Sequence, residues 1–281
     1  MSDETGRWFA DATPDEPERA NTAIRQGSAD APADWPTRAV DAGFAADEAA
    51  YYDALHEATL AATGAAVREA ERADDQQLLH AVRAMDDCER TANELAERLH
   101  EWAGSLFAGV GTGIDGARGV AERDPDGPAE ERAVALAERV VGLADEAADL
   151  RAHIERTAPE VAPNLATLAG PVLAARLIAL AGGLESLAKK PAGTIQVLGA
   201  EDALFAHLRG RAPSPKHGVI YVHEYVRGTR EEDRGSAARA LAGKLAIAAR
   251  GDHYRGEFNP AIERQLEERM ATIRARGEAD E

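Results

Sequence analysis

Residues 76–106 read "QQLLHAVRAMDDCERTANELAERLHEWAGSL", a stretch in which apolar residues recur every seven positions in two interleaved rows. The first row is Leu78, Met85, Ala92, Leu99 and Leu106, and the second is Ala81, Cys88, Leu95 and Trp102. Such rows are typical of the a and d positions of a coiled-coil heptad. A second heptad pattern runs through Ala133, Leu136, Val140, Leu143, Ala147, Leu150, Ile154 and Val161. Two apolar seams joined by the connector 107–129 predict an antiparallel coiled-coil hairpin.

The connector contains a motif that invites a different interpretation. Gly111, Gly113 and Gly116 spell GxGxxG, the spacing of a dinucleotide-binding fingerprint. That fingerprint requires a preceding strand within a βαβ unit, whereas here a heptad helix precedes the glycines. We therefore interpret them as loop residues, and Cys88 as a small residue of the seam.

The amino-acid composition limits the kinds of fold and function that this chain can have. Aromatic residues make up only 5% of the chain, which suits closely packed helices better than a β-sandwich. There is no apolar run of membrane-spanning length and no secretory signal in "MSDETGRWFADATPDEPE", so we expect no membrane association. The single cysteine fits a reducing, cytoplasmic setting. The net charge of −18 opposes general nucleic-acid binding and is expected of a halophilic protein, whose charge high salt screens.

We predict an all-α fold in several segments. Residues 1–45 are acidic and expected to be poorly ordered or minimally folded. Residues 46–158 hold a helix and the hairpin, residues 159–276 form a second helical domain, and residues 277–281 are an acidic tail. The run at 219–226 is the one stretch in the second domain with strand character.

Positive charge gathers in the second domain. All four lysines of the chain, Lys189, Lys190, Lys216 and Lys244, fall within 159–256, where 13 Lys and Arg face 9 Asp and Glu. Local positive charge on an acidic protein is typical of a surface that meets phosphate. The alternative is that Lys189 and Lys190 are helix-end charges next to a proline, favoured by the helix dipole.

Motifs in this domain resemble a known family. "APNL", "AGGL", "AKKPA", "QVLGAEDALF" and "PKHG" follow one another between residues 162 and 218 in the order and spacing of the Nop domain. "GSAARALAGKLAIAARGD", residues 235–252, is similar to a later helix of that domain, and with the preceding coiled coil the chain resembles the archaeal Nop proteins.

The resemblance implies a non-catalytic scaffold of box C/D guide ribonucleoproteins, active in rRNA and tRNA modification. Such a scaffold binds a kink-turn guide RNA together with a small ribosomal-type protein that recognises kink-turns. It self-associates through its coiled coil and recruits fibrillarin for RNA 2′-O-methylation. The resemblance also implies that the scaffold has no cofactor of its own, because fibrillarin is the protein that binds S-adenosylmethionine.

The resemblance also implies which residues meet RNA or the partner protein. The RNA-facing residues would be Lys189, Lys190, Ala192, Gln196, Lys216, His217, Arg234, Arg239 and Lys244. Contacts to RNA or to the partner protein would come from Glu201, Asp202, Phe205, Arg209 and Arg211. Asp202 departs from the family pattern, which usually has Lys after the Glu of "LGAE", and the N-terminal region and the hairpin are abbreviated.

Two other classes of function remain to be weighed. A coiled-coil interaction module without RNA contact would explain the heptads equally well. An enzyme is disfavoured, because no nucleophile motif or paired carboxylates in an apolar setting are found and we assign no catalytic residue. The spacing of His217, His223 and His253 fits no metal-ligand pattern, so we expect no metal site.

Overall fold

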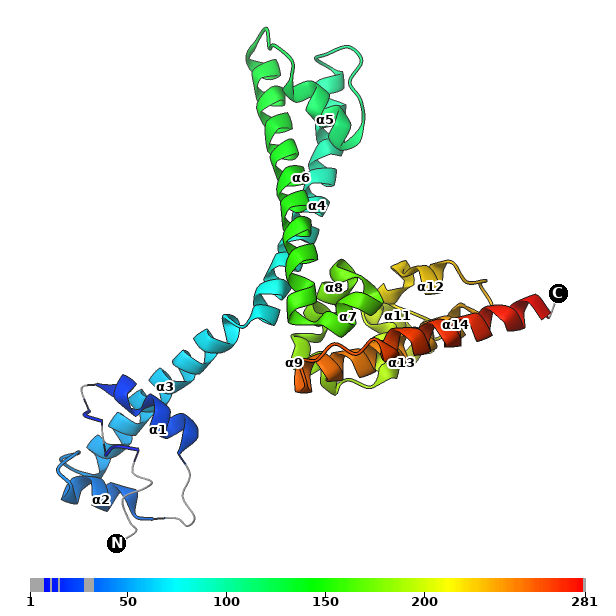
Figure 1. The fold of residues 1–281 in the computed structure, drawn as a ribbon. Coiled ribbons are helices and arrows are strands. Elements are labelled where there is room, and N and C mark those ends of the chain that lie inside the picture. Colours follow the sequence, from blue (N-terminus) through cyan, green and yellow to red (C-terminus); the bar gives the residue numbers. More distant parts are fainter. Residues whose placement is uncertain (1–7, 11, 15, 28–32, 280–281) are drawn as a thin grey trace. The chain divides into compact units, whose positions relative to one another are not determined.

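The computed structural model describes residues 8–10, 12–14, 16–27 and 33–279, and these residues form helices and loops with no strand among them (Figure 1). The all-α prediction is confirmed. The expected strand at 219–226 is wrong: Val219–Val222 forms the 3₁₀ helix η2 and Glu224–Arg227 forms the short helix α12. The apolar side chains of Ile220 and Val226 are buried in a helical core, which explains the pattern without a sheet.

The chain divides into two compact units, residues 1–73 and residues 74–281. In the first unit, η1 (Pro17–Ala20), α1 (Asn21–Gln26) and α2 (Trp35–Asp41) precede the long helix α3 (Glu48–Glu71). Asp47 caps α3, because its carboxylate accepts a hydrogen bond of 2.8 Å from the backbone N–H of Ala50.

Aromatic side chains form the core of this first unit. Phe9 and Tyr51 are buried, and the rings of Trp8, Trp35 and Phe44 pack around them at centroid distances between 5.2 and 6.5 Å. The Trp8 indole donates a hydrogen bond of 3.2 Å to the Tyr51 hydroxyl. We expected residues 1–45 to be poorly ordered or minimally folded; the described part of that stretch carries η1, α1 and α2. Trp35 of α2 belongs to the aromatic cluster, and Arg25 of α1 pairs with Glu69 of α3 at 2.7 Å. Residues 1–7, 11, 15 and 28–32 lie outside the described residues.

The second unit begins with the predicted hairpin. Helices α4 (Asp74–Gly104) and α6 (Pro128–Val161) run antiparallel and in contact along their length (Figure 1). One heptad row of each helix is buried, namely Leu78, Met85, Ala92 and Leu99 against Ala133, Val140, Ala147 and Ile154. The other row is less covered, since Cys88 and Leu95 are half-buried and Trp102 is 40% exposed.

The connector contains a helix that the sequence did not predict. α5 (Gly113–Ala121) packs Ala117 and Val120 between α4 and α6. A Cβ atom on Gly116 would approach the carbonyl oxygen of Gly111 to 2.1 Å, so the glycines of GxGxxG permit close packing of the loop on α5. No strand precedes them in the described chain, but the loop interpretation is correct for Gly111 alone, because Gly113 and Gly116 lie in α5.

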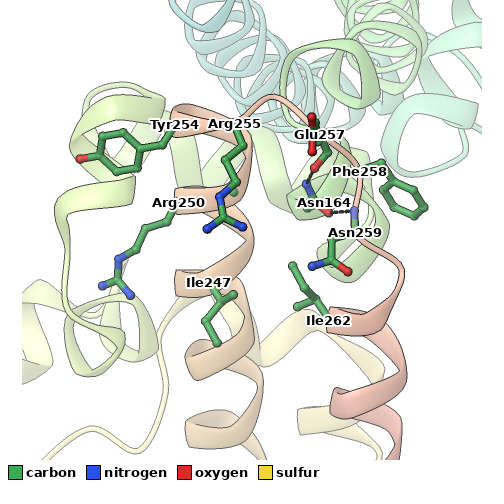
Figure 2. A pocket seen from close by; sticks show the side chains of 10 residues that line it. Asn164, Ile247, Arg250, Tyr254, Arg255, Glu257, Phe258, Asn259 and Ile262 are labelled. Atoms are coloured by element: carbon green, nitrogen blue, oxygen red, sulfur yellow. Dashed lines mark hydrogen bonds between the residues drawn. The ribbon is translucent and has the colours of Figure 1, made fainter.

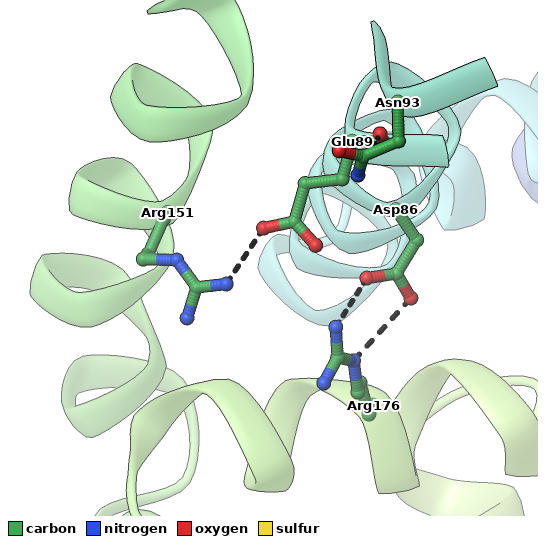
Figure 3. A network of polar contacts seen from close by, with 5 residues as sticks. All are labelled: Asp86, Glu89, Asn93, Arg151 and Arg176. Carbon is green, nitrogen blue, oxygen red and sulfur yellow. Dashed lines mark hydrogen bonds and ion pairs between the residues drawn. The ribbon is translucent and has the colours of Figure 1, made fainter. Parts of the chain in front are cut away.

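Two ion pairs lie at the base of the hairpin, one between its two helices and one to a neighbouring helix (Figure 3). Arg151 of α6 pairs with Glu89 of α4 at 2.7 Å. Arg176, on helix α8 (Pro171–Ala181), pairs with Asp86 of α4 through two guanidinium nitrogens, and its side chain is only 27% exposed. Because the second pair is partly shielded from water, we expect it to orient the hairpin base more firmly than exposed pairs do.

Several of the remaining helices pack on one long helix, α13 (Arg234–Tyr254), whose buried face is built of alanine and leucine. They include α7 (Pro163–Ala169), α9 (Leu184–Lys189), α10 (Ala192–Val197) and α14 (Ala261–Ala279). Helix α8 (Pro171–Ala181) packs instead on α4, α6 and α7, and α11 (Glu201–Leu208) follows α10 in the chain. The small side chains of α13 allow close approach of α7, α9 and α10, which form much of this core.

Within the described chain, no single helix is long and apolar enough to cross a lipid bilayer. Helices α7 and α8 together reach the length and hydropathy of a membrane span, but the chain bends by 116° between them.

Candidate nucleic-acid interface

The turn from α8 to α9 explains the "AGGL" motif. Gly182 and Gly183 both adopt positive φ, 86° and 120°. A Cβ on Gly183 would come within 2.7 Å of the movable end of the Gln76 side chain, so it is the positive φ that favours glycine here. The Asp75 carboxylate accepts a hydrogen bond of 2.8 Å from the backbone N–H of Leu184, which fixes the start of α9.

Helix α9 presents the two adjacent lysines at its end. Lys189 is exposed and pairs with Glu185 at 2.6 Å, which raises the pKa of Lys189 and lowers the pKa of Glu185. Lys190 follows as the C-cap residue, with its side chain half-buried. Arg250 of α13 donates hydrogen bonds to the backbone oxygens of Ala188 (3.1 Å) and Lys190 (3.3 Å). The backbone that carries both lysines is therefore held against α13.

The "QVLG" and "PKHG" motifs are tied to each other. Gln196 donates a side-chain hydrogen bond of 2.7 Å to the Lys216 carbonyl, and its own carbonyl accepts from Gly218 at 2.8 Å. Val219 donates to the Leu198 carbonyl at 2.7 Å. A Cβ on Gly218 would lie 1.9 Å from that Leu198 oxygen. The loop can lie this close to α10 only because residue 218 has no side chain.

Next to this junction, a histidine of the loop, a tyrosine of η2 and an arginine of α13 lie against one another. The His217 ring stacks on Tyr221 at 4.5 Å and 23°, and the Arg234 guanidinium lies 5.7 Å from the centre of the Tyr221 ring. Burial lowers the pKa of His217, and the positive charges of Arg234 and Lys216 lower it further, against a hydrogen bond that raises it. His217 is thus a neutral ring beside two cations, a combination suited to bases and phosphates.

Helix α11 carries the remaining motif residues. The Glu201 carboxylate accepts a hydrogen bond of 2.9 Å from the backbone N–H of Gly199, which closes the turn before the helix. Phe205 is 55% exposed and Leu208 is 70% exposed. Residues predicted to contact RNA or partner protein that lie exposed here are Glu201, Asp202, Phe205, Arg209 and Arg211. This helix offers an apolar surface with charges of both signs.

Helix α13 separates the basic residues into groups. Arg234 and Arg250 lie at its two ends, about 24 Å apart along the axis. Arg239 and Arg250 project in directions only about 20° apart, whereas Lys244 projects roughly 130° away from both. Lys244 donates a hydrogen bond of 2.6 Å to Gln265 on α14. The fold therefore brings Gln196, Lys216, His217 and Arg234 together, places Lys189, Lys190 and Ala192 nearer the other end, and directs Lys244 towards α14.

The fold depends on a polar pair that our reading of the residues did not single out. Asn164 is the asparagine of "APNL", and its buried side chain is hydrogen-bonded to Asp252 at 2.6 Å. The motif spacing pointed to Asn164, but its partner is 88 residues away, and only the fold brings them together.

No group of three or more His, Cys, Asp and Glu side chains in the described residues is placed to hold a metal ion. His223 instead bridges backbone groups, through Nε2 to the Leu168 carbonyl (2.9 Å) and through Nδ1 to the Tyr225 N–H (3.1 Å).

Comparison with known proteins decides the family. The family model Nop, described as "snoRNA binding domain, fibrillarin", matches residues 123–272. This chain belongs to the Nop family. The match covers the second hairpin helix and the core around α13, so every predicted contact residue from Lys189 to Lys244 lies within the matched region.

Individual relatives agree with this assignment. The Nop chain is 37% identical over 237 residues to an uncharacterised NOP5 family protein of Methanocaldococcus jannaschii, covering 71% of this chain and 57% of the relative. It is 40% identical over 144 residues to nucleolar protein 56 of Schizosaccharomyces pombe, covering 50% of this chain and 29% of the relative. The chain thus spans between about a third and somewhat over half of the length of these curated relatives.

A solved structure resembles the fold over almost its whole length. The crystal structure of a fibrillarin/Nop5p complex matches with a TM-score of 0.54 and 25% identity, covering 91% of this chain and 92% of the matched one. The similarity therefore includes both compact units of the Nop chain, not the Nop domain alone.

Proposed function

We propose that this chain is a non-catalytic scaffold of a box C/D ribonucleoprotein. Its Nop domain binds a guide-RNA kink-turn together with a small ribosomal-type protein, and its first unit holds fibrillarin for guided 2′-O-methylation. Methyl transfer from S-adenosylmethionine belongs to fibrillarin in this proposal. The observation that carries it is the tie between "QVLG" and "PKHG", which presents Lys216, His217 and Arg234 on one rigid surface.

The chemistry of this surface favours recognition of a shape over a base sequence. A few cations on a rigid frame position a phosphate backbone without reading bases. Specificity then comes from the kinked form of the RNA and from a protein already bound to it. The exposed apolar side chains of Phe205 and Leu208 give the partner protein a surface to cover.

High salt would weaken the phosphate contacts, because counterion release makes such affinity fall as salt rises. Apolar and hydrogen-bonded contacts to the partner protein then carry more of the binding free energy. The net charge of −18 and the acidic Asp202 in place of a lysine both point in this direction.

Fibrillarin binding and self-association are assigned to separate parts of the chain. The first unit is proposed to bind fibrillarin because the likeness to the fibrillarin/Nop5p complex covers 91% of this chain. The hairpin is proposed to pair with a second copy through its less covered heptad row, in which Trp102 is 40% exposed.

A gel shift at high salt tests the proposal. The purified chain is added to a box C/D kink-turn RNA, alone or with its ribosomal-type partner already bound. We expect a further shift with the preformed complex only. No shift with either target, while circular dichroism shows a folded helical protein, would contradict RNA recognition.

One observation supports a second candidate, a coiled-coil interaction module without RNA contact. Lys189 is already paired with Glu185, as a helix-end charge would be. Lys189→Glu combined with Lys216→Glu distinguishes the two. The double change abolishes assembly on the kink-turn complex if the scaffold proposal holds and leaves behaviour unchanged if the module proposal holds.

A further inference from the structure

A cavity of about 400 Å³ lies where α13 ends and α14 begins (Figure 2). Ile247 and Ile262 contribute apolar walls, and the Arg255 side chain extends into the space between α13 and Asn259. This is the opposite end of α13 from Arg234, so the cavity is separate from the stack of His217 on Tyr221.

The cavity is bordered by positive charge. Arg250 and Arg255 line it, and Glu257 is the one acidic side chain among its described lining residues. Arg250 is held in place by the backbone oxygens of Ala188 and Lys190, so the cavity adjoins the two lysines at the end of α9. On a chain with a net charge of −18, this local excess favours an anionic ligand.

Two aromatic rings flank the same cavity and are left open to solvent. Tyr254 is 63% exposed and Phe258 is 53% exposed. In Figure 2, Tyr254 and Arg250 extend on one side of the cavity and Phe258 lies on the other. Aromatic residues are only 5% of the chain, so two exposed rings beside one cavity are unusual here. Exposed rings beside guanidinium groups suit an unpaired nucleotide, whose base stacks and whose phosphate pairs with arginine.

We propose that this cavity binds an unpaired nucleotide of the RNA next to the kink-turn. The base stacks on Tyr254, and Arg255 contacts the phosphate. This inference rests on the proposed RNA-binding function and extends the RNA path from Lys190 across Arg250 to the end of α13. An acidic peptide would use the arginines but would have no use for the exposed rings.

Fluorescence anisotropy with two RNAs tests the proposal. One RNA is a kink-turn with blunt ends, and the other carries an unpaired tail of about five nucleotides, within the size range of single-strand sites. Each RNA is bound beforehand by the ribosomal-type partner, and the full chain is titrated in. The variants are Tyr254→Ala and Arg255→Ala, with Arg269→Ala as the matched control, because Arg269 is an exposed arginine on α14 away from the cavity.

We expect wild-type protein to prefer the tailed RNA by about fivefold or more, the change that loss of one base–aromatic stack produces. Tyr254→Ala and Arg255→Ala each reduce that preference without changing affinity for the blunt RNA, and Arg269→Ala changes neither. Circular dichroism shows that every variant remains folded.

Other outcomes overturn the inference in distinguishable ways. If wild-type protein binds both RNAs equally, the cavity site fails while the proposed function stands. If the Tyr254 and Arg255 variants lose affinity equally for both RNAs, the cavity contacts the partner protein or the paired RNA instead. If wild-type protein binds neither complex, the proposed function itself fails.

Discussion

The Asp252 carboxylate on α13 accepts hydrogen bonds from the backbone N–H and the side-chain amide of Asn164, at 3.0 and 2.6 Å. It also accepts one of 2.9 Å from the backbone N–H of Leu165, so it caps the first turn of α7. The Asn164 side chain in turn contacts the Glu257 carbonyl (2.9 Å) and the Asn259 N–H (2.7 Å). One buried pair therefore holds α7, α13 and the segment before α14 together.

Asp252→Ala tests this pair. Removing the carboxylate leaves the buried N–H groups of Asn164 and Leu165 without an acceptor, and each such loss costs about 1–3 kcal/mol. We expect the free energy of unfolding to fall by about 3 kcal/mol, measured by urea denaturation followed by circular dichroism. Asp145→Ala is the control, because Asp145 pairs with Arg118 at the surface; it should cost under about 1 kcal/mol. Equal effects of the two changes would contradict the capping role.

Gly218→Ala tests the approach of the "PKHG" loop to α10. The added Cβ would lie 1.9 Å from the Leu198 oxygen, so the loop must move away and take Lys216 and His217 with it. We expect assembly on the preformed kink-turn complex to fall at least tenfold while helical content stays unchanged. Gly142→Ala, in α6 with open space around it, should leave assembly intact and stabilise the helix by about 0.5–1 kcal/mol. Normal assembly by the Gly218 variant would argue against this loop as the RNA surface.

The salt dependence of binding reports how many cations meet phosphate. Each neutralised phosphate contributes about 0.7–0.9 to the slope of log affinity against log salt concentration. We expect Lys216→Ala to lower this slope by about that amount, measured by anisotropy over a series of salt concentrations. Arg118→Ala, at the hairpin tip, should leave the slope unchanged, since Arg118 pairs with Asp145 far from this surface. An unaltered slope for the Lys216 variant would remove Lys216 from the contact.

The buried His223 side chain is expected to make the free energy of unfolding depend on pH. Burial lowers its pKa, outweighing the Leu168 carbonyl and Glu224, which raise it. A histidine whose folded pKa lies below its unfolded value of about 6.5 stabilises the fold fully above that pH and loses this contribution as pH falls through the folded pKa. Protonation also removes the Nδ1 acceptor of the Tyr225 N–H.

We therefore expect the difference in unfolding free energy between wild type and His223→Gln to shrink as pH falls below about 6.5. Urea denaturation at a series of pH values measures it. A difference that stays constant over this range would show that His223 does not titrate against folding.

Local sequence predicted which segments carry the candidate interface, whereas the arrangement of those segments depended on contacts between distant residues. The motifs "AKKPA", "QVLG" and "PKHG" identified the segments that carry cations, because cations and glycines are visible in the chain itself. The sequence did not show which of these cations remain available to contact RNA. Lys189 pairs with Glu185 and Lys244 with Gln265, and only packing places Lys244 beside α14.

The sequence by itself determined the helical class, the hairpin and the family, because heptad spacing and motif order are local and periodic properties. Only the tertiary structure decided the form of 219–226, where burial of Ile220 and Val226 in a helical core overrode strand character. It also decided the helix α5, which forms where Ala117 and Val120 can be buried between α4 and α6. The tertiary structure also decided the pairing of Asn164 with Asp252, because a hydrogen bond between residues 88 positions apart depends on how the whole chain packs.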